Sequence, residues 1–296
     1  MELFRDKSEK YTLEVNTYLQ AYLPKKGSSP QVLHEAMHYA VMNGGKRIRP
    51  LLTYASAEAL SIDPLLMTPG AAAIELLHCF SLVHDDLPSM DDDDLRRGKP
   101  SLHKAFNEAI AILAADAMQS LAFHVLATDS SLNQKDDIRA SLASLLAEAS
   151  GTAGMTGGQA LDIEAEGKNI DLKDLEHIYH LKTGKLLRAC VMAPILYGDI
   201  SQSKISALES FIKDIGLAFQ IQDDIIEAEG NTEQIGKHSG SDKDKDKATF
   251  PKIIGLDASK RRVLDLFNQS NDVISIFGEK SEGLSHLAKI IIKRTS

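Results

Sequence analysis

Six aspartates lie within ten positions of the stretch SLVHDDLPSMDDDDLRRGKP, residues 81–100. Asp85 and Asp86 follow an apolar run directly, and four more aspartates precede Arg96 and Arg97. Carboxylates at the edge of an apolar core are costly unless a cation meets them. The stretch therefore predicts a cation site, with a solvated acidic turn as the alternative.

The spacing of Asp85 and Asp91 decides whether the two can share one ion. In an unbroken helix, six residues correspond to about 9 Å along the axis and about 120° around it, which is too far for one small ion. Pro88 disfavours helical geometry at Leu87 and removes a backbone donor. We therefore predict an interrupted helix that returns Asp91 to the face of Asp85. A calcium loop is excluded, because the glycine and the glutamate that it needs are missing in either register.

A second acidic cluster lies in FQIQDDIIE, residues 219–227. Asp223 stands four residues and Asp224 three residues before Glu227, so helical spacing places these carboxylates on one face, one turn after Gln220. A solvated surface helix is the alternative interpretation. Apolar side chains surround the acids, however, which predicts an enclosed face that holds a hard cation such as Mg²⁺, whose preferred ligands are oxygens.

Three basic clusters would contact anions. They are GGKRIRP, with Lys46, Arg47 and Arg49; DLRRGKP, with Arg96 and Arg97; and KTGK, with Lys182 and Lys185. Guanidinium groups bind phosphate oxygens in bidentate fashion, whereas lysine acts as a point charge. Each cluster alone is more often an exposed helix end. Together with the acidic clusters they predict a site for two polyanions, one bound through bridging metals and one bound directly.

A di-iron centre is a rival interpretation of two inward-facing carboxylate clusters. Such a centre needs Glu-x-x-His pairs, and the pairs Glu35–His38 and Glu75–His78 have that spacing. Neither pair contains the clustered aspartates, so Mg²⁺ with phosphate fits better. Except for His78, the histidines are interpreted as structural or surface residues, among them His34, His38, His84 and His103.

Helices must position these residues. Apolar residues recur at helical spacing in segments 31–45, 70–86, 108–127, 136–150, 174–197 and 204–229. Alternating strand runs are missing, so the pattern predicts an all-α bundle, with the whole chain (1–296) as one domain. The glycines of SGTAGMTGGQALD follow no strand and lack the GxGxxG spacing, which indicates close helix packing rather than a phosphate loop.

Composition excludes several classes of protein. The formal net charge of −9 argues against a nucleic-acid partner, which would want a basic face. No apolar run approaches the roughly 18 to 20 residues of a membrane span, and no secretory signal precedes the first helix, so a cytoplasmic location is expected. The two cysteines, Cys79 and Cys190, lack metal spacing and suit a reducing compartment.

The motifs together resemble one family. They are GGKRIRP, LVHDDLPSMDDDDLRRGKP, GMTGGQALD, HLKTGKLL, FQIQDDIIE and GKHSGSDKDKDKATFP, in this order. From about residue 43 to 255 the set resembles the trans-polyprenyl diphosphate synthases, most closely their bacterial farnesyl diphosphate synthase branch. The resemblance implies an all-α isoprenoid synthase fold, a large helical bundle around a central active-site cavity, usually as a homodimer. Glu227 departs from the family pattern, which has aspartate there.

The resemblance also implies a reaction. An allylic diphosphate, dimethylallyl or geranyl diphosphate, ionises; the double bond of isopentenyl diphosphate attacks the carbocation; and loss of a proton gives farnesyl diphosphate (C15). A geranyl or geranylgeranyl diphosphate synthase, a terpene cyclase and a non-catalytic partner of a prenyl synthase are the alternatives. A cyclase would not need the second cationic pocket, and a non-catalytic partner would lack one acidic motif.

Residue roles follow from the same resemblance. The Mg²⁺ ions, three per site, would be held by Asp85, Asp91 and Asp223, with Asp86 and Asp162 in support. The allylic diphosphate would be contacted by Arg96, Lys182 and Lys237, the last within a polar stretch (229–249) expected to act as a lid. Isopentenyl diphosphate would be bound by Lys46, Arg49, His78 and Arg97. The allylic cation would be stabilised by Thr183 and Gln220.

Product length is assigned to Phe80. If the growing tail runs along the helix that carries Asp85, a bulky side chain five residues earlier lies about 7.5 Å below the aspartate and forms the cavity floor. The short-chain members that this sequence resembles pair an aromatic residue here with the insertion containing Pro88, which implies a C15 product. Ordinary core packing is the alternative role for Phe80.

Overall fold

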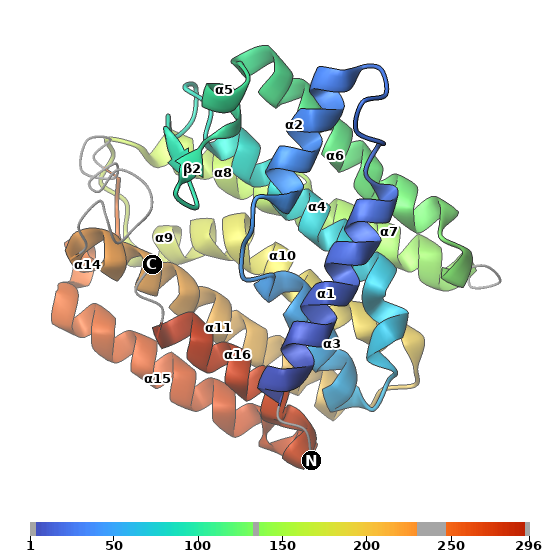
Figure 1. Ribbon diagram of the computed structural model, residues 1–296. Helices are drawn as coiled ribbons and strands as arrows, with labels where there is room; N and C mark the ends of the chain where they lie inside the picture. Colours follow the sequence, from blue (N-terminus) through green and yellow to red (C-terminus); the bar gives the residue numbers. More distant parts are fainter. Residues whose placement is uncertain (1–3, 133–135, 230–246, 294–296) are drawn as a thin grey trace.

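The computed structural model describes residues 4–132, 136–229 and 247–293, and helices dominate them (Figure 1). The α-helices are α1 (Phe4–Tyr22), α2 (Gln31–Met42), α3 (Ile48–Leu60), α4 (Thr68–Asp85), α5 (Leu102–Ala105), α6 (Glu108–Thr128), α7 (Asp136–Ser150), α8 (Met155–Ala165), α9 (Leu172–Tyr179), α10 (Lys185–Met192), α11 (Gln202–Glu229), α14 (Phe250–Ile254), α15 (Leu256–Ile274) and α16 (Glu282–Lys293). Shorter helical segments are η1 (Pro64–Met67), η2 (Ser130–Leu132), η3 (His180–Gly184), η4 (Ala193–Tyr197) and η5 (Ser275–Ser281). The predicted all-α fold is confirmed.

Helix α4 is the central element of the bundle. Most of its 18 residues are buried, because the sequence is apolar all round rather than on one stripe. Helices α1, α2, α3, α6, α7 and α10 all pack against it. The alanines Ala71–Ala73 let these neighbours approach closely, and all three are fully buried. The carboxyl end of α4 therefore emerges from the core, and the first acidic cluster begins there.

Helix α11 carries the second acidic cluster. It packs against α15, α10 and α16, and Figure 1 shows α11, α15 and α16 side by side on the opposite side of the molecule from α2 and α6. A second apolar cluster, which includes Ile221, Ile225 and Phe250, fixes the carboxyl-terminal half of α11 against α14 and α15. The acids of residues 219–227 are therefore not on one enclosed face as predicted, because Asp223 is exposed, Asp224 is buried and Glu227 is half-buried.

The chain turns sharply after α4, as the proline predicted. The helix ends at Asp85, and the backbone N–H of Asp91 donates to the carbonyl of Asp85 at 2.8 Å. The predicted interruption is therefore confirmed, because Asp91 is brought back beside the end of the helix. A short hairpin follows, β1 (Leu95–Arg96) with β2 (Lys99–Pro100), which the search for alternating strand runs did not predict.

The segment 174–197 is less regular than the predicted single run. Helices α9 and α10 are joined by η3, a π-helical segment of five residues, and η4 follows as a 3₁₀ segment. Helix α8 crosses η3 so closely that a Cβ on Gly158 would lie 2.1 Å from the backbone nitrogen of Lys182. The predicted role of this glycine-rich stretch in close helix packing is thereby confirmed, since no other residue fits at Gly158.

Two helical stretches are long and apolar enough to cross a membrane by length and composition, although the sequence predicted none. The stretch Pro64–Asp85 is 78% buried inside the protein, as a core helix is. In Glu108–Thr128 only 39% of the apolar window is buried, and Ile112 and Leu113 are exposed. Such helices are weak indications of a membrane span, because core helices of soluble proteins have the same composition.

Candidate active site

A cavity of about 1010 Å³ opens between α4 and α11. Thirteen of the predicted site residues line it: Lys46, Arg49, His78, Phe80, Asp85, Asp91, Arg96, Arg97, Asp162, Lys182, Thr183, Gln220 and Asp223. Lys237 lies outside the described residues, as does most of the expected lid (residues 230–246). The structure thus brings together side chains from five separate stretches of sequence, 46–49, 78–97, 162, 182–183 and 220–223.

The two acidic clusters share this cavity. Asp85 and Asp91 reach it from the end of α4 and the turn that follows, and Asp223 and Glu227 reach it from α11. Burial raises the pKa of Asp85, and the neighbouring carboxylate of Asp91 adds to the shift, whereas Lys182 opposes it. A carboxylate whose charged form is disfavoured by burial is one that a cation would stabilise.

Asp86 does not line the cavity with the predicted metal ligands. It is 2% exposed, and its carboxylate accepts a hydrogen bond from Nε of Arg96 at 2.9 Å and a second one from the same guanidinium. Burial lowers the pKa of Arg96, but Asp86 and then Asp93 outweigh it and raise the pKa above its usual range. Asp86 therefore holds the positively charged guanidinium of Arg96, and Arg96 lines the cavity together with Asp85.

Lys247 is a site residue that the sequence did not single out. Its ammonium lies 2.8 Å from Oδ1 of Asp91, 3.6 Å from Oδ2 of Asp162 and 3.8 Å from Oε1 of Glu166. Asp162 also pairs with Lys182 at 2.7 Å. Only the run DKDKDK marked this region, and alternating charges are usually solvated. The contact depends on α8 and the start of α14 facing the turn after α4, which sequence spacing cannot reveal.

The π-helical segment presents polar groups deep in the cavity. The hydroxyl of Thr183 donates to Oε1 of Gln220 at 2.8 Å, so two oxygen dipoles from η3 and α11 meet. Burial lowers the pKa of Lys182, but Asp162, Asp85 and Asp91 together outweigh it and raise the pKa above the ordinary lysine value. Single π-helical turns within helices are frequent at functional sites.

A cationic pocket occupies another part of the cavity. NH1 of Arg49 lies 3.1 Å from Nε2 of His78, and burial followed by Arg49 and Arg97 keeps the pKa of His78 well below its ordinary value. An arginine only donates, so Nε2 accepts and the proton of the neutral ring is on Nδ1. The guanidinium of Arg97 donates to the carbonyl of Gly44.

Arg47, the third basic residue of GGKRIRP, has a structural role instead. Its guanidinium donates to Glu75 at 2.7 Å, to the carbonyl of Val41 at 2.7 Å and to Asn16 at 2.9 Å. Both side chains of the Arg47–Glu75 pair are 2% exposed. Glu75 therefore neutralises a buried arginine, which also rules out the di-iron interpretation of the Glu75–His78 spacing.

Asp224 is likewise structural, although spacing grouped it with Glu227. Its carboxylate accepts the hydroxyl of Tyr179 at 2.8 and 2.9 Å and the backbone N–H of Phe250 at 2.8 Å. These bonds tie α11 to α9 and α14. Both aspartates of the second acidic cluster line the cavity, but Asp223 is exposed there, whereas Asp224 is buried and holds the neighbouring helices.

One helical cavity thus contains both carboxylates and cationic side chains, an arrangement with oxygen ligands for hard divalent cations and with guanidinium and ammonium groups for polyanions. The residues fit such ions, because the ammonium of Lys247 already lies among Asp91, Asp162 and Glu166. The polyprenyl synthetase family model matches residues 30–281. The chain belongs to the polyprenyl synthetase family, and its fold is the isoprenoid synthase fold.

Characterised proteins resemble the chain over nearly its full length. Farnesyl diphosphate synthase from Escherichia coli (strain K12) is 44% identical over 264 residues, 88% of each chain. The structure of an FPP/GFPP synthase from Zymomonas mobilis superimposes with a TM-score of 0.87 at 36% identity, covering 97% of this chain and 98% of that one. A geranyltransferase from Helicobacter pylori, solved with magnesium and isoprenyl diphosphate, has a TM-score of 0.85 at 29% identity and 97% coverage of both chains.

Proposed function

We propose that the protein is a Mg²⁺-dependent prenyltransferase that condenses isopentenyl diphosphate with dimethylallyl or geranyl diphosphate to give farnesyl diphosphate. One observation carries this proposal: a single cavity of about 1010 Å³ is lined by carboxylates of two motifs and, separately, by a pocket of arginines and a neutral histidine. Two diphosphates can thus be bound by different means. The high identity to farnesyl diphosphate synthases supports the product class.

Asp85, Asp91 and Asp223 would hold the Mg²⁺ ions, three per site, with Asp162 in support. When bound there, the ions would neutralise the allylic diphosphate and stabilise the charge that develops on it as a leaving group. Arg96 and Lys182 stay protonated and contribute fixed positive charge to the same group. Lys237 is assigned to this set by the family motif alone.

The remaining lining residues serve the second substrate and the cation. Arg49, Arg97 and Lys46 bind isopentenyl diphosphate by direct contact, and the neutral His78 accepts a hydrogen bond from Arg49, which orients the guanidinium. Oxygen dipoles of Thr183 and Gln220 stabilise the allylic carbocation. The proposed reaction needs no nucleophilic side chain. The departing diphosphate is the base that removes the final proton.

A product assay tests the function. The protein is incubated with geranyl diphosphate, isopentenyl diphosphate and Mg²⁺, and the products are sized after phosphatase treatment. Farnesol is expected, and EDTA should abolish it. A terpene cyclase would convert an allylic diphosphate alone into a hydrocarbon, a geranylgeranyl diphosphate synthase would give the C20 alcohol, and a non-catalytic partner would give nothing. Any of these three results contradicts the proposal.

Product length is expected to change when Phe80 is replaced by alanine. Phe80 lies on α4 and lines the cavity, with its ring 5.1 Å from that of His84. Removing the ring lowers the cavity floor, so the chain can accept a further isoprene unit before steric contact stops elongation. The Phe80→Ala variant should shift the main product from C15 to C20 or longer, as measured by chromatography of the released alcohols.

Phe267→Ala is the matched control for this variant. Phe267 is a half-buried aromatic residue of α15 that does not line the cavity. Its removal should leave the C15 product unchanged. If Phe80→Ala also gives only C15, this residue does not set the chain length and its role is core packing.

The apolar face of α6 is proposed to bind a second copy of the chain. Ile112 is 42% and Leu113 53% exposed, on a helix whose apolar composition fits a buried environment. Exposed contiguous apolar surface on a helix of this kind is typical of a subunit interface. Two protomers related by a twofold axis would cover both faces at once. The proposed dimer explains the exposed apolar side chains of α6 without a membrane.

We also propose a cytoplasmic location. Cys79 and Cys190 are buried and form no disulfide, as is usual in a reducing compartment.

Replacing Leu113 by glutamate should weaken the proposed dimer. A charge in the centre of an apolar interface is left unpaired, which we expect to raise the dimer dissociation constant at least tenfold. Light scattering coupled to size-exclusion chromatography measures the shift to monomer. Leu264→Glu on α15 is the matched control, because Leu264 is 56% exposed and lies away from α6. Equal molecular masses for both variants would place the interface elsewhere.

A further inference from the structure

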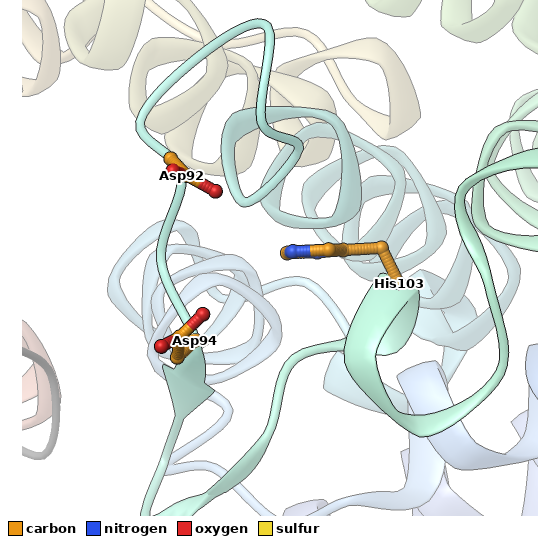
Figure 2. Close-up of side chains that lie close together, drawn as sticks. All are labelled: Asp92, Asp94 and His103. Carbon is orange, nitrogen blue, oxygen red and sulfur yellow. The ribbon is translucent and has the colours of Figure 1, made fainter.

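Asp92, Asp94 and His103 form a cluster outside the catalytic cavity. Their potential ligand atoms all lie within 4.8 Å of one another, and none of the three residues lines the cavity. Figure 2 shows the imidazole of His103 directed toward the gap between the two aspartate side chains. The proposed mechanism uses none of these residues, and His103 was interpreted from the sequence as a structural or surface residue.

The hairpin brings the three residues together. Leu95 pairs with Pro100, and the backbone N–H of Ser101 donates to the carbonyl of Asp94 at 2.9 Å. Arg97 and Gly98, which form the turn, both have positive φ angles, as a type I′ hairpin turn requires. Because the chain reverses there, the start of α5 lies beside Asp94, and His103 in that first turn reaches the aspartates.

His103 is buried, and one of its ring nitrogens could bind a metal ion. The residue is 7% exposed, and its Nε2 is buried without a hydrogen-bond partner among the described residues. Its Nδ1 lies 3.2 Å from Oγ of Ser101. When Nδ1–H donates to this hydroxyl, Nε2 carries a lone pair, which is the form that binds a metal. Burial lowers the pKa of His103 and Lys104 adds to the shift, whereas Asp92, Asp94 and Glu108 oppose it.

Two carboxylates and an imidazole lone pair directed at one point repel one another unless a cation lies between them. Lys104 supplies part of this charge, because its ammonium pairs with Oδ1 of Asp94 at 2.8 Å. That lysine is 45% exposed and can move toward solvent. Asp92 is exposed and Glu108 adds further negative charge nearby.

We propose that Asp92, Asp94 and His103 bind a divalent transition-metal ion, Zn²⁺ or Mn²⁺ by ligand type, at a second metal site. One imidazole with two carboxylates suits these ions better than Mg²⁺, which prefers oxygen ligands alone. The ion would fasten the turn after α4 to α5. Asp91 and Arg96 are carried by the same turn, so the site would hold catalytic residues in place without contacting substrate.

Zinc titration by isothermal calorimetry tests the site. The full-length Asp85→Asn/Asp223→Asn variant removes one carboxylate from each side of the catalytic cavity, so zinc binding there is reduced. This background should bind one zinc ion per chain, and adding His103→Gln should weaken that binding at least tenfold, since loss even of groups that only support a metal ligand costs 10- to 100-fold. A hundredfold excess of zinc over its dissociation constant should also raise the melting temperature of the background by roughly 5 °C.

Adding His124→Gln to the same background provides the matched control, because His124 is an exposed histidine on α6. Equal zinc binding by the His103→Gln and His124→Gln variants would overturn the proposal, as would a background that binds no zinc. Should the background fail to fold, crystals of the unaltered protein soaked in zinc chloride decide the matter. An anomalous difference peak between Asp92, Asp94 and His103 supports the site, and peaks only at the catalytic aspartates refute it.

Discussion

Replacing Asp85 by asparagine should lower kcat for chain elongation about 10³-fold, which corresponds to about 4 kcal/mol of transition-state free energy. The asparagine keeps the size of the side chain but loses the charge that would hold a divalent ion at the allylic diphosphate. The charge on the leaving group develops in the transition state, so the loss falls on kcat rather than on KM for isopentenyl diphosphate. Steady-state kinetics with geranyl diphosphate measure both constants.

Stability provides a second measurement for the same variant. Burial raises the pKa of Asp85, which means that its charge opposes folding in the absence of metal. Asp85→Asn should therefore unfold at the same urea concentration as the unaltered protein, or at a higher one. Asp265→Asn is the matched control, since Asp265 is an exposed aspartate on α15 that does not line the cavity and should retain full kcat. A loss of kcat below tenfold for Asp85→Asn would show that the residue does not hold a catalytic ion.

Replacing Glu75 by leucine should lower the free energy of unfolding by about 3–5 kcal/mol. Its partner Arg47 would be left with an uncompensated charge at 2% exposure, where Asn16 and the carbonyl of Val41 remain as acceptors among the described residues. Urea denaturation at fixed protein concentration measures the change. The double variant Arg47→Met/Glu75→Leu should recover most of the loss, because both charges then leave the core.

An exposed ion pair of similar length shows whether burial is the cause. Lys260 and Glu229 approach to 2.6 Å but are 45% and 44% exposed. Lys260→Met should cost less than about 1 kcal/mol, since solvent screens such pairs. Equal destabilisation by Glu75→Leu and Lys260→Met would contradict the assignment. The comparison separates geometry, which the two pairs share, from dielectric environment, which they do not.

Local signals in the sequence predicted much of the fold. The segment 108–127 corresponds to α6 and the segment 136–150 to α7, because each repeats apolar residues at helical spacing. Pro88 identified the point where α4 ends, since a proline acts on its immediate neighbours wherever it stands. The first acidic motif was predicted to form a cation site because it directly follows an apolar helix, where unpaired carboxylates are costly.

Other features depended on residues distant in sequence. Asp224 has the same local spacing as its neighbours and also lines the cavity, but its carboxylate accepts hydrogen bonds from Tyr179 and the backbone N–H of Phe250, so it holds helices together. Asp86 is adjacent to a cavity carboxylate, yet Arg96 engages it behind the turn. In both cases the hydrogen-bond partners come from other elements of the fold, so tertiary packing decides which carboxylate they engage.

The sequence by itself determined the helical class, the break after α4, the two carboxylate motifs and the family. Those properties reside in residue type and short-range spacing, which act through local backbone sterics and periodic burial. Only the tertiary structure decided that Lys247 lies among Asp91, Asp162 and Glu166, that Arg47 is neutralised by Glu75, and that His103 meets two aspartates. Each of these contacts joins segments that are distant in sequence and that helix packing brings together. The role of a charged group or a nitrogen lone pair depends on the group that packing places beside it.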